Sequence, residues 1–247
     1  MDIFLRESKS NRNKIESKYQ GSQSIDYPDD NLNSLIIFFC GWALDYHCFS
    51  FLESDMDILF VYNYRDFNLE FDFSKYKKIF LIAYSYGVYV SSKVVCCLPK
   101  IDYSIAINGT LRPIDKHFGI SEKVFNLTCD NLDLMTINKF YGKLFNNQED
   151  LFYFINNFKP LLPIQDNKES LINIKNSFLS SDNNSLSSKV VEFKYDKAII
   201  SENDRIFPFK SQLNFWNNYN LSDRTEVYKF PHFPFFQFRT FREILEL

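Results

Sequence analysis

The chain of 247 residues has only three histidines, no marked excess of either charge and no long apolar run. No stretch approaches the roughly 18 apolar residues that span a bilayer, and the opening MDIFLRESKSNRNK lacks the apolar segment of a signal peptide. Lys and Arg number 28 against 31 Asp and Glu, and the net charge of -3 provides no overall attraction to nucleic acid or an anionic membrane. We therefore expect a soluble, cytoplasmic protein with neither of these partners.

The number and spacing of the cysteines do not indicate a metal-binding protein. The five cysteines form an odd set without metal-ligand spacing: Cys40, Cys48, Cys96, Cys97 and Cys129. Free buried thiols are the favoured interpretation. We expect no metal and no organic cofactor.

What the sequence does contain is a series of short apolar runs typical of buried strands. They cover residues 34–40, 57–62, 78–84, 103–108, 197–201 and 225–230. Their apolarity is continuous rather than alternating, which indicates burial on both faces, as in a parallel sheet covered by helices. The polar stretch of residues 8–33 is expected to be a long connection or a hairpin.

Between the fourth and fifth of these runs the pattern becomes helical. Apolar residues recur at i, i+3, i+4 and i+7 in Leu151, Phe154, Ile155 and Phe158. We therefore predict an α/β fold, with a core of residues 1–110 and 190–247 and a helical cap inserted at residues 111–189.

One serine follows the strand-like run that ends at Tyr84. It lies in the pentapeptide Ala83-Tyr84-Ser85-Tyr86-Gly87. A small-x-Ser-x-Gly pattern is typical of the α/β-hydrolase elbow, where the nucleophile stands on a tight strand-to-helix turn. Serine is equally common as a helix N-cap, so the pentapeptide alone leaves both interpretations open.

A catalytic serine of this fold requires an acid and then a histidine later in the chain. Of the three histidines, His232 in KFPHFPFF directly follows the last strand-like run, where the general base is expected. Asp204 follows the run at 197–201 and is the favoured acid, with Glu202 as a competitor closer to the strand end. A packed histidine and a turn aspartate are the alternatives, but the order Ser85, Asp204, His232 favours catalysis.

The oxyanion of such a reaction needs two backbone N–H donors. Tyr86 provides the first, because it follows the nucleophile. In FFCGWALD, Gly41 allows a tight turn and Trp42 is expected to provide the second.

The combination of FFCGWALD, AYSYGVYV, AINGTLRPIDKHFGI, SENDRIFP and KFPHFPFF resembles the BioG-type pimeloyl-[acyl-carrier protein] methyl ester esterases of the α/β-hydrolase superfamily. The narrower signals are the Gly-Trp turn with Asp45 and the Asn108-Gly109-Thr110 run. The resemblance implies a triad of Ser85, Asp204 and His232 that cleaves the methyl ester of a pimeloyl chain on acyl carrier protein, in biotin precursor synthesis. It departs from many superfamily members at Ala83 and Cys40.

An acidic carrier would be favoured by basic residues on the cap. Lys139 and Lys143 lie one helical turn apart, and three more candidates are near in sequence: Arg112, Lys116 and Lys123. A solvated helix face is the alternative for each of them. A general short-chain carboxylesterase and a non-catalytic carrier-binding protein remain the alternative functions.

Overall fold

A seven-stranded sheet forms the centre of the computed structural model, which describes residues 1–8, 33–183, 193–219 and 221–247. The strands are β1 (Asp2–Arg6), β2 (Ser34–Phe39), β3 (Asp57–Tyr62), β4 (Lys78–Tyr84), β5 (Tyr103–Ile107), β6 (Lys197–Ser201) and β7 (Thr225–Tyr228). Their spatial order is β1-β3-β2-β4-β5-β6-β7. Strands β2 to β7 run parallel, and β1 pairs antiparallel with β3.

The parallel register aligns the carboxyl ends of the central strands. Phe39 pairs with Ala83, and Ile107 pairs with both Tyr84 and Ile199. The segments that leave β2, β4, β5 and β6 therefore start from one edge of the sheet, where ligands bind in open α/β sheets. The predicted site residues on these segments meet at this edge.

Strand β2 is buried along its whole length, as its unbroken apolar sequence predicts. The ring of Phe38 packs edge-on against Phe49, Phe60, Phe235 and Phe241, with centroid distances of 4.7 to 5.7 Å. Burying one such side chain stabilises the fold by roughly 1.5–3 kcal/mol. These contacts hold the C-terminal segment against the sheet.

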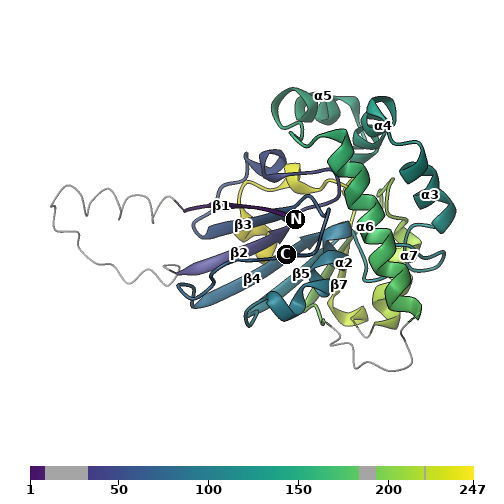
Figure 1. Cartoon of the computed structure of the whole chain (residues 1–247). Coiled ribbons are helices and arrows are strands. Elements are labelled where there is room, and N and C mark those ends of the chain that lie inside the picture. Colours follow the sequence, from purple (N-terminus) through teal and green to yellow (C-terminus); the bar gives the residue numbers. More distant parts are fainter. Residues whose placement is uncertain (9–32, 184–192, 220) are drawn as a thin grey trace, which may run out of the picture.

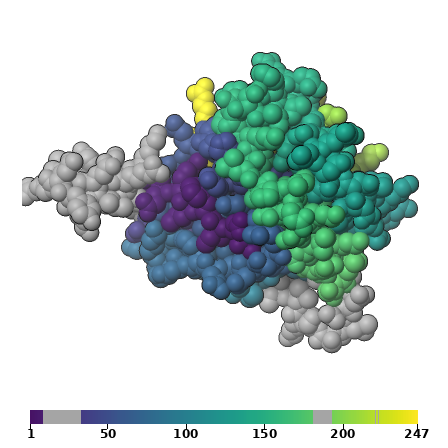
Figure 2. Space-filling view, turned by 45° about the horizontal axis from the view of Figure 1, so that its top comes forward, coloured from purple at the N-terminus to yellow at the C-terminus, as the bar shows by residue number. Residues whose placement is uncertain are grey.

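The helices flank the sheet, with one group gathered at one end (Figure 1). That group follows β5: α3 (Glu122–Asp130), α4 (Leu134–Leu144), α5 (Gln148–Asn157) and α6 (Ile164–Asn183), hereafter the cap helices. The others are α2 (Tyr86–Lys93), α7 (Phe209–Asn218) and α8 (Phe241–Leu245), with short 3-10 turns η1 (Tyr46–Phe49), η2 (Val95–Cys97), η3 (Ser222–Arg224) and η4 (Phe235–Gln237). Figure 2 shows the cap helices as a continuous teal and green surface beside the purple and blue N-terminal strands.

The predicted fold class, a mostly parallel sheet flanked by helices, is confirmed. Each predicted strand exists, with ends shifted by at most two residues. The sequence reading missed β1, and most of the connection predicted at 8–33 lies outside the described residues. In the described part of the chain, no helix is long and apolar enough to cross a membrane.

Candidate active site

Ser85 stands between β4 and α2 in a strained backbone conformation, with φ 56° and ψ -124°. A non-glycine residue with positive φ costs of order 1–3 kcal/mol and persists only where the surroundings enforce it. The Ser85 N–H donates to the carbonyl of Ile107 at 2.8 Å, which ties the turn to β5. The Ser85 side chain makes no capping bond to α2, so the hydroxyl is directed elsewhere.

Two glycines allow this turn to pack closely. A Cβ on Gly87 would lie 2.5 Å from the carbonyl oxygen of Phe39, and one on Gly109 would lie 2.2 Å from that of Ser85. Both contacts are with backbone, which has little freedom to move. The glycine two residues after Ser85 is thus explained, and so is the glycine of the Asn108-Gly109-Thr110 run.

The Ser85 hydroxyl meets the predicted histidine and acid in one buried chain of contacts. Its Oγ lies 3.1 Å from Nε2 of His232, and Nδ1 of His232 lies 2.7 Å from Oδ2 of Asp204. Ser85 is 3% exposed and His232 1% exposed. The three residues come from segments far apart in sequence, at the carboxyl edge of the sheet.

Asp204 is fixed by its own surroundings. Its Oδ1 accepts from the N–H groups of Ile206 and Phe207, and its Oδ2 accepts from Nε2 of Gln212 at 3.1 Å. The competing acid, Glu202, is exposed. Gln212 was not found by sequence reasoning, because an isolated glutamine in a helical pattern carries no signal.

Asn108 connects the histidine segment to the sheet. Its Nδ2 donates to the carbonyl of His232 and to Oγ of Ser201, both at 2.8 Å, and its Oδ1 accepts from Ser201 N–H. The backbone has φ 48°, a left-handed conformation that asparagine tolerates better than most residues. The resemblance singled out this residue without a role, and its position indicates that it orients the His232 segment.

The phenylalanines next to His232 in sequence hold the His232 segment by packing into the core. Phe233 and Phe235 are fully buried, and the Phe233 N–H donates to the carbonyl of Leu144 at the end of α4. Tyr84 lies against the imidazole, with ring centroids 5.2 Å apart. Burial, and then the charge of Asp204, raises the pKa of Tyr84 well above its ordinary value, so this phenol stays neutral beside His232.

Trp42 and Tyr86, the two predicted oxyanion residues, are both nearly buried. Tyr86 is the first residue of α2, and first-turn N–H groups have no partner within a helix. Trp42 packs its ring against Phe140 of α4 and donates from Nε1 to the carbonyl of Asn167 at 2.7 Å.

A cavity of about 350 Å³ opens between these two residues and the cap helices. Its walls are mainly apolar side chains with three cations: Trp42, Tyr86, Ile120, Val124, Phe125, Leu127, Thr128, Thr136, Lys139, Phe140, Lys143, Leu171, Arg205 and Ile206. The structure therefore brings Lys139 and Lys143 together at the cavity. Arg112, Lys116 and Lys123 do not line it, and Arg112 pairs with Asp115 at 2.9 Å.

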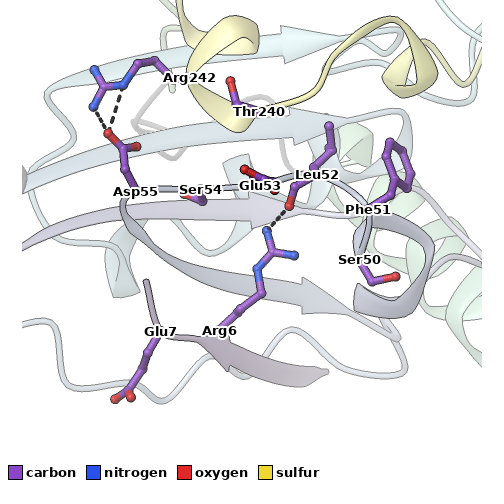
Figure 3. Close-up of a pocket in the computed structure, with 10 residues that line it drawn as sticks. All are labelled: Arg6, Glu7, Ser50, Phe51, Leu52, Glu53, Ser54, Asp55, Thr240 and Arg242. Carbon is purple, nitrogen blue, oxygen red and sulfur yellow. Dashed lines mark hydrogen bonds and ion pairs between the residues drawn. The ribbon is translucent and has the colours of Figure 1, made fainter. Parts of the chain in front are cut away.

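A second hollow, of about 630 Å³, is lined by residues of β1, the segment before β3 and the start of α8 (Figure 3). Arg6 donates there to the carbonyl of Leu52 at 2.9 Å, and Arg242 pairs with Asp55. These contacts join β1, the segment before β3 and α8. None of the predicted site residues lines this hollow.

Among the residues that the structure describes, no group of three or more His, Cys, Asp or Glu is placed to hold a metal ion. Cys40 and Cys48 are buried beside Asp45, and burial raises the pKa of both thiols. In the described chain, the cysteines are free thiols, but the prediction that all are buried is wrong for Cys96 and Cys97, which are exposed.

The fold and the strained serine at its sheet edge define an α/β-hydrolase. Solved structures share this fold: BioG from Haemophilus influenzae has a TM-score of 0.77 at 23% identity and covers 99% of this chain and 100% of its own. A lipase-esterase related protein from Clostridium acetobutylicum has a TM-score of 0.52 at 16% identity, and the match covers 83% of this chain and 89% of the Clostridium chain.

The chain belongs to the BioG family: the family model described as pimeloyl-ACP methyl esterase BioG matches residues 23–240. The description of this family names an esterase activity, and the fold of the chain supports such a role.

Two curated relatives are longer than the region they share with this chain. A protein of Bacteroides fragilis (strain 638R) named malonyl-[acyl-carrier protein] O-methyltransferase is 34% identical over 190 residues, which cover 74% of this chain and 36% of the relative. An uncharacterized protein of Haemophilus influenzae is 36% identical over 121 residues, covering 48% and 54%. The chain thus spans about a third and about half of the length of these relatives.

Proposed function

We propose that the protein is a serine esterase that hydrolyses the methyl ester of pimeloyl-[acyl-carrier protein], with Ser85, His232 and Asp204 as the catalytic triad. The observation that carries the proposal is the buried chain of contacts from Ser85 Oγ through His232 to Asp204. The family match supports the substrate class.

In the proposed reaction, His232 Nε2 removes the Ser85 proton as Oγ attacks the ester carbonyl. The tetrahedral intermediate collapses when the methoxy oxygen takes that proton from His232 and leaves as methanol. A water molecule, deprotonated by His232, then attacks the acyl-enzyme, and the Ser85 oxygen leaves with that proton as the free carboxyl end of the acyl chain is released. Such proton transfer typically contributes about 10²- to 10⁴-fold in rate.

Asp204 holds the imidazole in the tautomer with its proton on Nδ1 and stabilises the imidazolium that forms. Its remaining acceptor positions are filled by Ile206, Phe207 and Gln212, so the carboxylate has a single orientation toward His232. The backbone N–H groups of Tyr86 and Trp42 donate hydrogen bonds to the oxyanion of the tetrahedral intermediate.

The cavity accommodates the acyl chain. Its apolar walls suit the methylene groups of a pimeloyl chain, and the cap helices cover the ester. Lys139 and Lys143 attract the acidic carrier to the cavity, with smaller contributions from Arg112, Lys116 and Lys123.

The name of the Bacteroides relative gives no reason to propose methyltransferase activity for this chain. The match covers only 36% of that relative, so most of the named methyltransferase lies outside it. The relative's name nevertheless supports a carrier-bound substrate, because it acts on an acyl-[acyl-carrier protein].

The test compares methyl-pimeloyl carrier protein with a short nitrophenyl ester, using released methanol and nitrophenol as readouts. We expect the carrier ester to have the higher kcat/KM and the Ser85→Ala variant to lose at least about 10³-fold in kcat with both substrates. Equal preference would favour a general carboxylesterase. Carrier binding without turnover of either ester would favour a binding protein.

A further inference from the structure

Asp45 is a buried carboxylate in the loop that follows β2, and the proposed reaction does not use it. It is 1% exposed. Its Oδ1 accepts from the His47 N–H at 2.9 Å and lies 3.7 Å from the Cys48 thiol. Burial, and then the charge of Asp45, raises the pKa of Cys48, so the thiol keeps the proton that it shares with this carboxylate.

The other carboxylate oxygen of Asp45 reaches a distant part of the chain. Oδ2 accepts from the backbone N–H of Leu161 at 2.6 Å, and Leu161 lies between α5 and α6. One side chain therefore holds its own loop with one oxygen and the cap segment with the other.

The same loop is tied to the cap at two more points. Trp42 Nε1 donates to the carbonyl of Asn167 in α6 at 2.7 Å, and the Tyr141 hydroxyl of α4 contacts the carbonyl of Ala43 at 3.4 Å. Ala43 has φ 62°, a conformation that a residue with a Cβ keeps only under constraint. The strained turn thus lies between Trp42 and Asp45, whose side chains both bond to the cap.

We infer that Asp45 is a positioning residue that clamps the cap to the loop carrying Trp42, so that the cap and the second oxyanion donor move as one unit. The kinetic consequence rests on the proposed esterase reaction, whereas the clamp itself is a property of the fold. Misplacing a catalytic group by about 1 Å can cost about 10²-fold in rate.

The variant that tests the clamp is Asp45→Asn. An amide retains one acceptor oxygen and places an NH₂ group where the second oxygen stood, so it cannot accept from Leu161 and His47 together. We expect kcat for a nitrophenyl ester to fall by about 10- to 100-fold, with KM changed less than about 2-fold. The concentration of active sites used to calculate kcat is measured by titration with an organophosphate.

A matched control breaks another bond between the cap and the core. Asn173 of α6 donates from Nδ2 to the carbonyl of Tyr64 at 3.0 Å, in a loop that supplies no predicted site residue. Asn173→Ala should leave kcat within about 2-fold of the wild type. An equal loss in both variants would show that any cap attachment serves, and would overturn the role of Asp45.

Amide hydrogen exchange tests the clamp independently of turnover. In Asp45→Asn, exchange should accelerate together in residues 40–48 and 159–163, and in Asn173→Ala these two segments should keep their wild-type rates. Unchanged exchange in residues 40–48 of Asp45→Asn would overturn the inference, whatever the activity. A wild-type protein that fails to cleave esters would count against the proposed function alone, because the exchange result still decides the clamp.

Discussion

The carboxyl edge of the sheet and the cap helices differ sharply in how their residues are held. At the sheet edge, Ser85, Asn108 and His232 are almost completely buried, and each is fixed by hydrogen bonds to neighbouring strands or loops. On the cap, Leu134 is 71% exposed and Phe152 is 74% exposed. Under the proposed function, the buried sheet edge carries the chemistry and the exposed helices meet the carrier protein.

Substitutions should therefore separate into two kinds. Changes at the sheet edge should lower kcat for every ester, whereas changes to exposed charged residues on the cap should affect the carrier substrate alone.

The largest effect is expected at the acid of the triad. Asp204→Asn should lower kcat by about 10⁴-fold, because an amide facing His232 favours the tautomer with its proton on Nε2, which cannot accept the Ser85 proton. Stopped-flow or steady-state assays with a nitrophenyl ester measure this loss. Glu202→Gln is the control, since Glu202 is the exposed neighbour that competed as the acid. A greater loss in Glu202→Gln than in Asp204→Asn would mean that the acid is misassigned.

An intermediate effect is expected at Asn108. Asn108→Ala leaves buried partners on Ser201 and His232 unsatisfied and places alanine at φ 48°. Unsatisfied buried groups cost about 1–3 kcal/mol, so the free energy of unfolding should fall by at least that amount. The freed His232 segment should also lower kcat by about 10- to 100-fold.

Asn63 offers a closely matched control for Asn108. It also follows a strand, β3, is buried and has a positive φ of 55°, but its amide contacts Asp2 and Asp166. Asn63→Ala should lose comparable stability in urea unfolding and keep kcat per folded molecule. If both variants lose kcat equally, Asn108 acts through general stability rather than through His232.

The strands, and the meeting of Ser85, Asp204 and His232, could be predicted because their signals are local. A continuous apolar run predicts a buried strand, and Ser85, Asp204 and His232 each follow such a run in the order that the fold requires. The sequence predicts the ends of strands less precisely. The predicted strand at 103–108 includes Asn108, but the backbone turns there into the left-handed region and β5 ends at Ile107.

Residues that act through tertiary contacts could not be predicted in the same way. Gln212 and Asp45 are isolated polar residues whose roles depend on partners 8 and 116 positions away. Strand β1 was missed because DIFLR is short and only partly buried, and it becomes a strand by pairing with the edge of β3.

The smallest effect is expected at the two cavity lysines. Replacing Lys139 and Lys143 by Glu should raise KM for methyl-pimeloyl carrier protein by about 5- to 20-fold, because an exposed charge contributes up to about 1 kcal/mol and reversal also introduces repulsion. The KM of a neutral nitrophenyl ester should stay within about 2-fold. The difference between the substrates should shrink in high salt, since exposed charges are screened.

Lys100→Glu makes a charge reversal of the same kind away from the cavity, since Lys100 is exposed shortly before β5 begins and so lies toward the amino end of the strands. It should leave both KM values unchanged. Arg112→Glu, Lys116→Glu and Lys123→Glu should each change the carrier KM less than the lysine pair, because these residues do not line the cavity. A larger effect from that second group would show that the carrier docks near the start of the cap rather than at the cavity mouth. Equal effects on both substrates would instead mean that Lys139 and Lys143 shape the acyl cavity, and the division between a chemical edge and a recognition surface would no longer hold.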